Sequence, residues 1–217
     1  MKRMNHKSSC TKGLYAVTPD LADSADLLRR VRLALAGGAQ VLQYRNKLAT
    51  AALGLTQATA LRQLTREFAV TFIVNDDAHL AAQVEADGVH LGSGDADIRA
   101  ARQILGPHKI IGISCYNRLI LAHAAAKAGA DYVAFGAFFS SQIKPDAAVA
   151  DINLLRQANA ELDVAIVAIG GITTHNGAVL VQAGADALAV ISDLFDAADI
   201  SAAAQNFSKL FIQDRML

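Results

Sequence analysis

Ala183-Gly184-Ala185-Asp186 leads directly into the apolar run Ala187–Ile191, and the same tetrapeptide at Ala128–Asp131 leads into Tyr132–Phe135. Glycine commonly ends a helix in the left-handed conformation, after which the chain turns into the next element. A short apolar run bounded by such a turn is typical of a buried strand. The repeat therefore predicts two helix-to-strand turns of the same kind.

Short apolar runs occur eight times along the chain, at Leu14–Val17, Val41–Gln43, Thr71–Val74, Gly88–Leu91, Ile110–Ile113, Tyr132–Phe135, Ala165–Ile169 and Ala187–Ile191. Stretches with helical spacing of apolar residues lie between them, as at Leu27, Val31 and Leu35. Strict alternation of strands and helices predicts a parallel sheet. Eight such units in about 200 residues predict an α/β fold of the (β/α)8 TIM-barrel class. An open doubly wound sheet is the alternative, although no Gly-x-Gly-x-x-Gly pattern follows the first strand.

The composition is that of one well-packed globular domain. The chain has 217 residues, 53% of them hydrophobic, and a formal net charge of zero. We expect a single barrel domain over residues 13–217, preceded by a basic, disordered leader over residues 1–12. Zero net charge argues against a nucleic-acid partner. No apolar run approaches the roughly 18 residues of a membrane span.

Cysteine and histidine usage argues against a disulfide framework and against a zinc site. Cys10 falls in the predicted leader and Cys115 follows a strand, which is typical of a reduced, cytoplasmic protein. The six histidines include no pair at i, i+4. We interpret His90 and His123 as packing or helix-surface residues. Tyr44 and Tyr132 are interpreted as core residues.

The direction of the chain sorts the polar residues into two groups. In a (β/α)8 barrel the helix-to-strand turns lie at one end, and the residues after each strand lie at the other, where active sites are built. Asp87, Asp131 and Asp186 precede strands and are therefore interpreted as structural. Polar residues that follow strands are the functional candidates. They include Ser114, and also Ser141 and Lys144 in the loop Gly136–Asp151.

Two cations follow the second strand, in the segment Gln43-Tyr44-Arg45-Asn46-Lys47. Alternate strand residues share a face, so Gln43, Arg45 and Lys47 point the same way if the strand continues. The planar fork of Arg and the compact charge of Lys together suit a phosphate group. The alternative is a solvated strand end with no ligand.

Two carboxylates follow neighbouring strands, Asp76 after the third and Asp95 after the fourth. Their convergence suits Mg²⁺, which takes few carboxylates and completes its shell with water and phosphate oxygens. The alternative is helix capping, by Asp95 for the helix 96–105 and by Asp76 or Asp77 for the preceding helix. For Asp77 capping is the preferred interpretation.

Gly170-Gly171 and Ser192 follow the seventh and eighth strands. That position commonly binds a ligand phosphate in barrels of this class. A tight turn that requires glycine is the alternative. Together the polar residues at this end predict two phosphorylated small-molecule substrates, one of them carrying a metal-bound diphosphate.

The residues at this point resemble the thiamine-phosphate synthase family over nearly the whole chain. The matching motifs are Gln43-Tyr44-Arg45-Asn46-Lys47, Ile73-Val74-Asn75-Asp76-Asp77, Ala86–Gly92 with Asp95, Ile111-Gly112-Ile113-Ser114, and Ala168–Ile172. The resemblance implies a (β/α)8 barrel that joins 4-amino-2-methyl-5-(diphosphooxymethyl)pyrimidine to 4-methyl-5-(2-phosphoethyl)thiazole. The products would be thiamine phosphate and diphosphate.

The same resemblance implies a role for each motif residue. The pyrimidine diphosphate would be held by Gln43, Tyr44, Arg45, Asn46, Lys47, Asn75, Ser114 and Lys144, of which Arg45, Lys47, Ser114 and Lys144 are the catalytic set. Asp76 and Asp95 would bind Mg²⁺. The thiazole phosphate would be held by Ser141, Gln142, Ile143, Gly171, Ile191 and Ser192.

The implied reaction needs no protein nucleophile, because the pyrimidine methylene cation forms as the diphosphate departs. The loop Gly136–Asp151 is the natural lid over this cation. Ile143 and Ser93 depart from the family pattern, which usually has Thr and Gln there, so we expect weaker thiazole-phosphate binding. A thiazole tautomerase-like relative and a non-catalytic phosphate-binding regulator are the alternatives. A homo-oligomer is left open.

Overall fold

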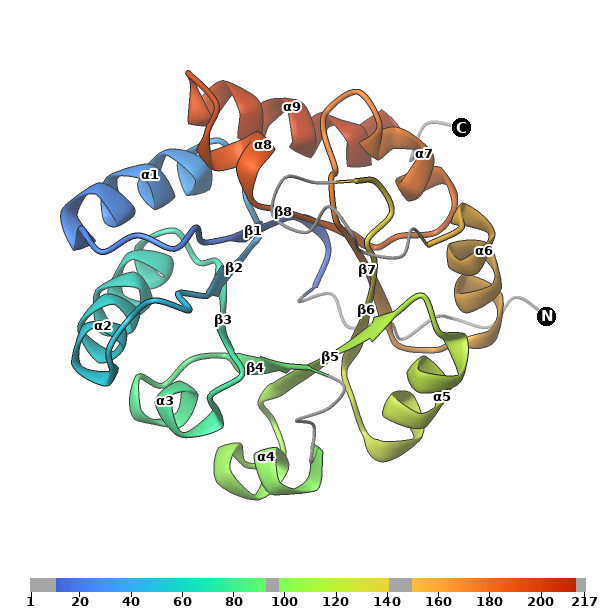
Figure 1. Cartoon of the computed structure of the whole chain (residues 1–217), viewed down its shortest axis with the longest axis horizontal. Coiled ribbons are helices and arrows are strands. Elements are labelled where there is room, and N and C mark those ends of the chain that lie inside the picture. Colours follow the sequence, from blue (N-terminus) through green and yellow to red (C-terminus); the bar gives the residue numbers. More distant parts are fainter. Residues whose placement is uncertain (1–10, 93–97, 141–149, 214–217) are drawn as a thin grey trace.

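The computed structural model describes residues 11–92, 98–140 and 150–213. They form a closed barrel of parallel strands in the order β1-β2-β3-β4-β5-β6-β7-β8, surrounded by helices (Figure 1). The strands are β1 Gly13–Val17, β2 Val41–Tyr44, β3 Thr71–Asn75, β4 Gly88–Leu91, β5 Ile110–Tyr116, β6 Tyr132–Phe135, β7 Ala165–Ile169 and β8 Ala187–Val190. The helices are α1 Ser24–Ala36, α2 Ala51–Glu67, α3 Ala78–Gln83, α4 Ile98–Leu105, α5 Leu119–Ala128, α6 Ile152–Glu161, α7 Gly177–Gln182, α8 Ser192–Phe195 and α9 Ile200–Gln213.

Each strand pairs with the next strand along the chain, and β1 closes the ring by pairing with β8 at Gly13 and Ala187. The (β/α)8 prediction is therefore confirmed, and the open sheet is excluded. Three of the predicted strands have the observed bounds, and the largest difference is in β5, which runs three residues further to Tyr116. The extension matters because it includes Ser114.

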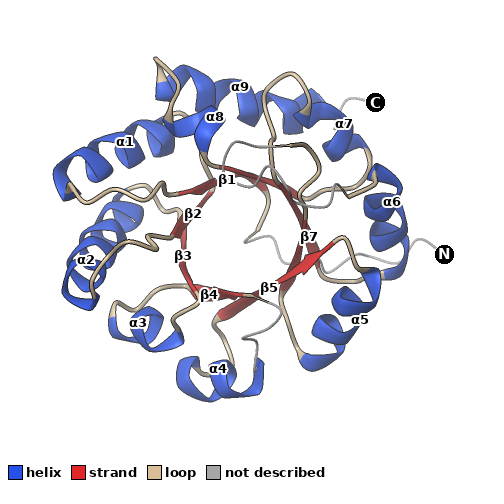
Figure 2. Ribbon diagram, in the orientation of Figure 1, coloured by secondary structure: helices blue, strands red, loops and turns tan. Residues whose placement is uncertain are grey.

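Two apolar layers hold the barrel together, one inside the ring of strands and one between the strands and the helices. Figure 2 shows the ring of strands enclosed by the helices. The inner layer contains Tyr15, Val41, Ile73 and Tyr132. The outer layer contains the alternate strand residues, such as Leu14 and Leu42, together with the helix residues that cover them. This alternation means that Gln43 lies on the face of Val41, and Asn75 lies on the face of Ile73, so both continue the barrel interior.

The carboxylates that precede strands are structural, as predicted. Asp87 accepts a hydrogen bond from the Phe72 N–H at 2.8 Å and binds Arg62 in two contacts of 2.8 and 2.9 Å. Asp131 accepts from the Ile111 N–H at 2.8 Å, and Asp186 accepts from the Ile166 N–H at 2.9 Å. Each carboxylate thus holds the start of the neighbouring strand and leaves the opposite end of the barrel for function.

The predicted leader over residues 1–12 falls largely outside the described residues and stays a prediction. Of its last two positions, Thr11 is buried, with 1% of its surface exposed. Within the described ranges, none of the helices combines the length and the apolar character needed to cross a bilayer.

Candidate active site

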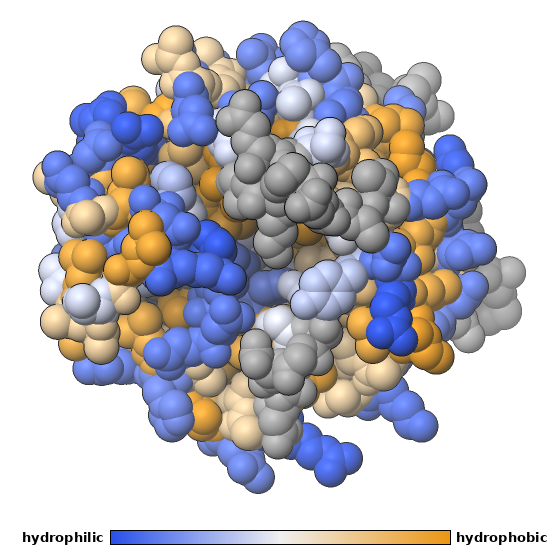
Figure 3. Space-filling model, in the orientation of Figure 1, coloured by the Kyte–Doolittle hydropathy of each residue, from blue (hydrophilic) through white to orange (hydrophobic). Residues whose placement is uncertain are grey.

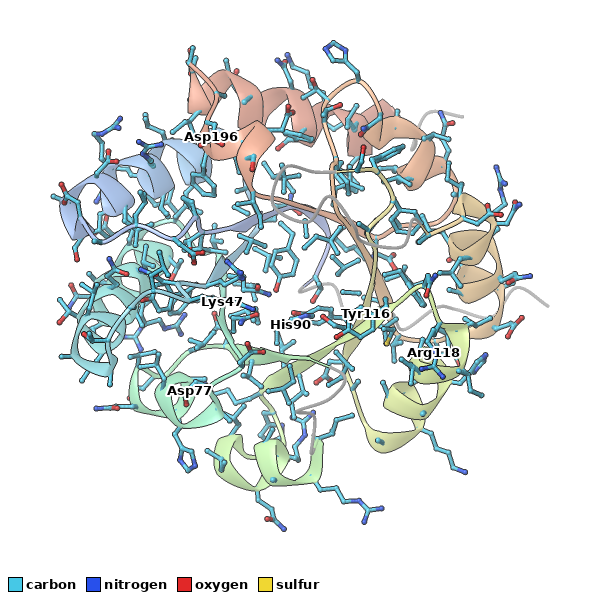
Figure 4. All side chains as sticks on the ribbon, in the orientation of Figure 1. Lys47, Asp77, His90, Tyr116, Arg118 and Asp196 are labelled. Carbon is cyan, nitrogen blue, oxygen red and sulfur yellow. The ribbon has the colours of Figure 1, made fainter. Side chains whose placement is uncertain are left out.

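Polar side chains gather where the strands end, around a hollow near the centre of the face in Figure 3. Lys47 and Tyr116 lie on opposite sides of the barrel with His90 between them, whereas Asp77, Arg118 and Asp196 lie outward, toward the helices (Figure 4). A cavity of about 580 Å³ lies between the first turns of α2 and α3, and its lining includes Arg45, Lys47, Asn75 and Asp76. The fold therefore brings the residues predicted after β2 and β3 to one place.

Asp20 pairs with Arg45 and holds the backbone of Lys47, and sequence reasoning missed it. Its Oδ1 lies 3.2 Å from the Arg45 guanidinium and accepts the Lys47 N–H at 2.8 Å. Thr18 fixes the same loop, because its Oγ1 accepts the Arg45 N–H at 2.8 Å and donates to the Arg45 carbonyl at 2.7 Å. The available signal was position, since Thr18 and Asp20 directly follow β1. The carboxylate beside Arg45 offsets the free-energy cost of removing water from this partly buried cation.

Tyr44 and Asn46 face the loop and α2 rather than the barrel interior. The Tyr44 hydroxyl donates to Gln57 Oε1 at 2.9 Å, and Asn46 Nδ2 donates to the Leu21 carbonyl at 2.8 Å and to Gln57 Oε1 at 3.0 Å. Burial, followed by the charge of Asp20, raises the pKa of Tyr44 to about 12. The prediction that Tyr44 is a core residue is confirmed. Contact of these two side chains with a substrate stays a prediction.

A chain of buried hydrogen bonds crosses the barrel interior from β2 to β5. Gln43 Nε2 donates to the Tyr15 hydroxyl at 2.9 Å, and the Tyr15 and Tyr132 hydroxyls are 2.8 Å apart. His90 lies between Tyr132 and Ser114, with Nδ1 2.9 Å from the Tyr132 hydroxyl and Nε2 2.9 Å from Ser114 Oγ. His90 is buried and packs on Tyr132, as interpreted, but sequence reasoning missed that both of its ring nitrogens are hydrogen-bonded.

Close packing fixes the rings in this chain. The Tyr132 ring stacks on His90 with centroids 5.5 Å apart and meets Tyr15 edge-on at 6.0 Å. A Cβ at Gly112 would lie 1.9 Å from Tyr132 Cζ, so only glycine leaves room for the ring. Burial raises the pKa of Tyr15 and of Tyr132, and it lowers the pKa of His90 to about 4. All three groups are consequently neutral around pH 7.

Asp76 and Asp77 have different environments at the end of β3. Asp77 caps α3, because its Oδ1 accepts the Leu80 N–H at 2.8 Å. The interpretation of Asp77 as a helix cap is therefore confirmed. Asp76 is exposed, has a φ of +62°, and donates its N–H to the His90 carbonyl at 2.7 Å. Its Oδ2 accepts a hydrogen bond from Asn75 Nδ2 at 2.7 Å. Asp76 is thus held by its backbone rather than used as a cap.

The donor set around Asp76 fits Mg²⁺ better than a transition metal. Carboxylate and amide oxygens are hard ligands, and Mg²⁺ takes one or two carboxylates together with water and substrate phosphate. No cluster of three or more His, Cys, Asp or Glu that could hold a metal occurs within the described part of the chain. Asp95, the second predicted ligand, lies outside the described residues, as does Ser93.

Gly170 and Gly171 make room for the segment that leaves β6. A Cβ at Gly171 would come within 2.5 Å of the Ser140 carbonyl oxygen, and one at Gly170 within 2.3 Å of Ala137 Cβ. Both glycines also have positive φ, which is +103° at Gly170 and +62° at Gly171. The close approach brings the end of β7 against Ser140, directly before the predicted thiazole-phosphate residues. Those residues, Ser141, Gln142 and Ile143, lie outside the described residues, and so does Lys144.

Ile191 and Ser192 mark the passage from β8 into the short helix α8. Ile191 is the residue before the helix, with φ −116° and ψ −85°, and Ser192 is its first residue. They lie at the same end of the barrel as Gly171, as the strand order requires.

Tyr116 is a second residue that sequence reasoning missed. It ends β5, two residues after Ser114, with a φ of +52° and half of its surface exposed. Positive φ is costly for a bulky residue and often marks functional sites. A search restricted to polar residues at strand ends does not select an aromatic ring.

A family model described as thiamine monophosphate synthase matches residues 14–194. The chain belongs to the thiamine-phosphate synthase family. A thiamine-phosphate synthase from Methylobacillus flagellatus is 55% identical over 206 residues, which cover 95% of this chain and 98% of that protein. One from Thiobacillus denitrificans is 53% identical over 199 residues, covering 92% and 94%.

The solved structures agree with this assignment. Thiamine phosphate pyrophosphorylase from Pyrococcus furiosus is 37% identical, with a TM-score of 0.84 over 93% of this chain and 96% of that one. A 3-hexulose-6-phosphate synthase has a TM-score of 0.68 at 17% identity, over 91% of this chain and 99% of that one, and shares the fold alone.

The structure shows what several residues of the thiamine-phosphate synthase motifs do. Gly112 in Ile111–Ser114 accommodates Tyr132, and Asp87 in Ala86–Gly92 anchors β3. His90, in the same segment as Asp87, joins Tyr132 to Ser114. These motif residues therefore shape the barrel interior beneath the site.

Proposed function

We propose that this chain condenses 4-amino-2-methyl-5-(diphosphooxymethyl)pyrimidine with 4-methyl-5-(2-phosphoethyl)thiazole to give thiamine phosphate and diphosphate. As a member of the thiamine-phosphate synthase family, it is a transferase of thiamine biosynthesis. The observation that carries the substrate assignment is that Arg45, Lys47, Asn75 and Asp76 line one cavity at the carboxyl end of the strands. Such a set suits a strongly charged diphosphate.

The pyrimidine diphosphate lies, in this proposal, over β2, β3 and β5. Arg45 is supported for this role because it is only 18% exposed and is already held beside the carboxylate of Asp20. A diphosphate bound there exchanges part of that ion pair for a charge-assisted contact with the substrate. Gln43 and Ser114 lie deeper, at the two ends of the interior hydrogen-bonded chain. Gln43 is proposed to meet the pyrimidine, and Ser114 the oxygen that joins the pyrimidine methylene to the diphosphate.

Asp76 and Asp95 are proposed to hold Mg²⁺. When bound, this ion supplies charge neutralisation to the departing diphosphate. Support comes from the hard carboxylate oxygens of Asp76, which Asn75 Nδ2 orients, and from the backbone contact that holds Asp76 beside β4.

The reaction begins when the bond between the pyrimidine methylene carbon and the bridging oxygen breaks, and the electron pair leaves with the diphosphate. Arg45, Lys47 and Lys144 are proposed to stabilise the growing negative charge. The thiazole nitrogen then donates its electron pair to the methylene carbon. No proton has to be removed by a strong base, and all three buried titratable groups of the interior chain are neutral around pH 7.

The thiazole phosphate is proposed to lie over β6, β7 and β8, against Gly171, Ile191 and Ser192, with Ser141 to Ile143 from the loop. The support is the 2.5 Å approach that a Cβ at Gly171 would make to the Ser140 carbonyl oxygen, which brings that loop beside β7. Exclusion of water by the loop then protects the cation.

The test is two-part. Titration calorimetry of the full chain with each substrate should show that Lys47→Ala weakens only the pyrimidine diphosphate, whereas Ser192→Ala weakens only the thiazole phosphate. Competition between the two ligands would contradict the division of the site. Failure of purified, folded protein to form thiamine phosphate from both substrates and Mg²⁺ would contradict the function.

The cytoplasm is the proposed compartment. Its support is the cysteine usage, since Cys115 is free and buried, and burial raises its pKa to about 12.

A further inference from the structure

In the interior hydrogen-bonded chain, defined as Gln43, Tyr15, Tyr132, His90 and Ser114, the donor at Gln43 sets the direction in which the protons point. Each tyrosine hydroxyl and the neutral imidazole carry a single proton. Gln43 presents Nε2, a donor, to the Tyr15 oxygen at 2.9 Å. Tyr15 must therefore pass its own proton onward, and the acceptor in reach is the Tyr132 oxygen at 2.8 Å.

The remaining protons follow from this first step. Tyr132 has accepted from Tyr15, so its proton goes to His90 Nδ1 at 2.9 Å. The imidazole then carries its proton on Nε2 and donates it to Ser114 Oγ at 2.9 Å. Ser114 becomes an acceptor within the protein, and its own hydroxyl proton is left for a ligand.

With Gln43 Nε2 facing Tyr15, the reverse direction leaves a buried proton without a partner. If Ser114 donated to His90 and His90 to Tyr132, the Tyr15 oxygen would receive hydrogen bonds from both Tyr132 and Gln43. The Tyr15 proton would then find no acceptor within the part of the chain that the structure describes. Tyr15 is buried, so water cannot replace the missing partner without entering the core.

We propose that His90 is a positioning residue for the transfer reaction. It carries its proton on Nε2, holds Ser114 Oγ as an acceptor, and so directs the Ser114 hydroxyl proton toward the oxygen of the departing diphosphate. The proposal rests on the proposed function for the identity of that ligand, and on the hydrogen-bonded chain for the direction of the proton. Packing supports it, because stacking on Tyr132 prevents the imidazole from turning away.

The direction of the hydrogen bonds in the interior hydrogen-bonded chain is measured without substrate. In the full chain labelled with ¹⁵N-histidine, the His90 signals are identified by their loss in His90→Gln. At neutral pH we expect a protonated Nε2 and a bare Nδ1. A proton on Nδ1, or on both nitrogens, would overturn the proposal. This measurement is independent of activity, so it still decides the matter if no thiamine phosphate forms.

The role of His90 is tested by two exchanges that reach different atoms. The Asn side chain reaches the position of Nδ1 and keeps the contact with Tyr132, whereas Gln reaches the position of Nε2 and Ser114. We expect His90→Asn to lower kcat about 10-fold with little change in KM, and His90→Gln to stay within about 3-fold of the wild type. Thermal unfolding of both variants reports any loss of folding.

A double-mutant cycle separates positioning from a general structural effect. In a Ser114→Ala background, His90→Asn should lower kcat by less than about 2-fold, because His90 acts through the missing hydroxyl. Equal damage from His90→Asn in both backgrounds would overturn the proposal. His123→Gln, at a surface position that bonds Glu161, is the matched histidine control and should leave kcat unchanged.

Discussion

Asp20 lies 3.2 Å from the Arg45 guanidinium while its Oδ1 also accepts the Lys47 N–H. One carboxylate from the loop after β1 therefore pairs with the Arg45 side chain and also fixes the main chain at Lys47. This arrangement differs from two free cations at a strand end, because the loop is formed before any ligand arrives. Preorganised cations lose less entropy when a diphosphate binds.

The two functions of Asp20 can be separated by substitution. Asp20→Asn keeps an oxygen for the Lys47 N–H, so we expect the KM for the pyrimidine diphosphate to change less than about 3-fold. Asp20→Ala removes the acceptor and should raise KM about 10-fold, consistent with the loss of a hydrogen bond to a charged group. Steady-state kinetics at saturating thiazole phosphate measures both. Equal effects of the two exchanges would show that charge alone matters.

Asp76 and Asp77 are neighbours with opposite predicted phenotypes. Asp76→Asn, chosen because Asn tolerates positive φ, should lower kcat about 100-fold and leave thermal stability unchanged, since the exchange removes a metal-binding charge. Asp77→Ala should lose about 1 kcal/mol of unfolding free energy through the lost helix cap and retain turnover. Magnesium titrations and thermal melts of both variants provide the check. Reversal of the two phenotypes would remove the metal assignment.

Glycine exchanges test the packing beneath the site. Gly112→Ala places a Cβ 1.9 Å from Tyr132 Cζ, so we expect a loss of about 3 kcal/mol or more in unfolding free energy. Gly54→Ala is the matched control, because Gly54 lies inside α2 and a Cβ there would meet the Tyr44 hydroxyl at an ordinary 3.8 Å. That exchange should stabilise the protein by about 0.5–1 kcal/mol through helix propensity. Urea denaturation measures both, and an unaffected Gly112→Ala would contradict the packing.

The buried imidazole makes stability depend on pH. Unfolded His90 binds a proton near its ordinary pKa of 6.5, whereas the folded pKa is about 4. Between these values the unfolded state holds more protons, so the free energy of unfolding falls as pH falls. The contribution is about 3 kcal/mol across the window. Chemical denaturation between pH 7 and pH 4 should show a shallower decline in His90→Gln, and identical slopes would refute the prediction.

The strands could be predicted because each is buried on both faces and is therefore a nearly continuous apolar run. Polar residues that follow strands were then taken as the functional candidates. They included Gln43, Arg45, Asn75, Asp76 and Ser114, which lie together at the carboxyl end of the barrel. The direction of the chain also separated Asp87, Asp131 and Asp186, whose carboxylates bond the starts of β3, β5 and β7.

The interior chain could not be predicted because its bonds join residues far apart in sequence. Tyr15 and Tyr132 are separated by 117 residues, and His90 and Tyr132 by 42. Their contact depends on the register of several strands and on the space left at Gly112, and neither is visible in a local pattern. Asp20 follows β1, so its position was a signal, but it was missed because no cation stands beside it in sequence.

The central claim is that this barrel end couples the two heterocycles with release of diphosphate. The most direct measurement incubates the purified full chain with the pyrimidine diphosphate, the thiazole phosphate and Mg²⁺, and quantifies thiamine phosphate and diphosphate over time. The account predicts equal amounts of the two products, none when either substrate is omitted, and arrest when EDTA removes the metal. Folded protein that binds both substrates but forms no thiamine phosphate would contradict it.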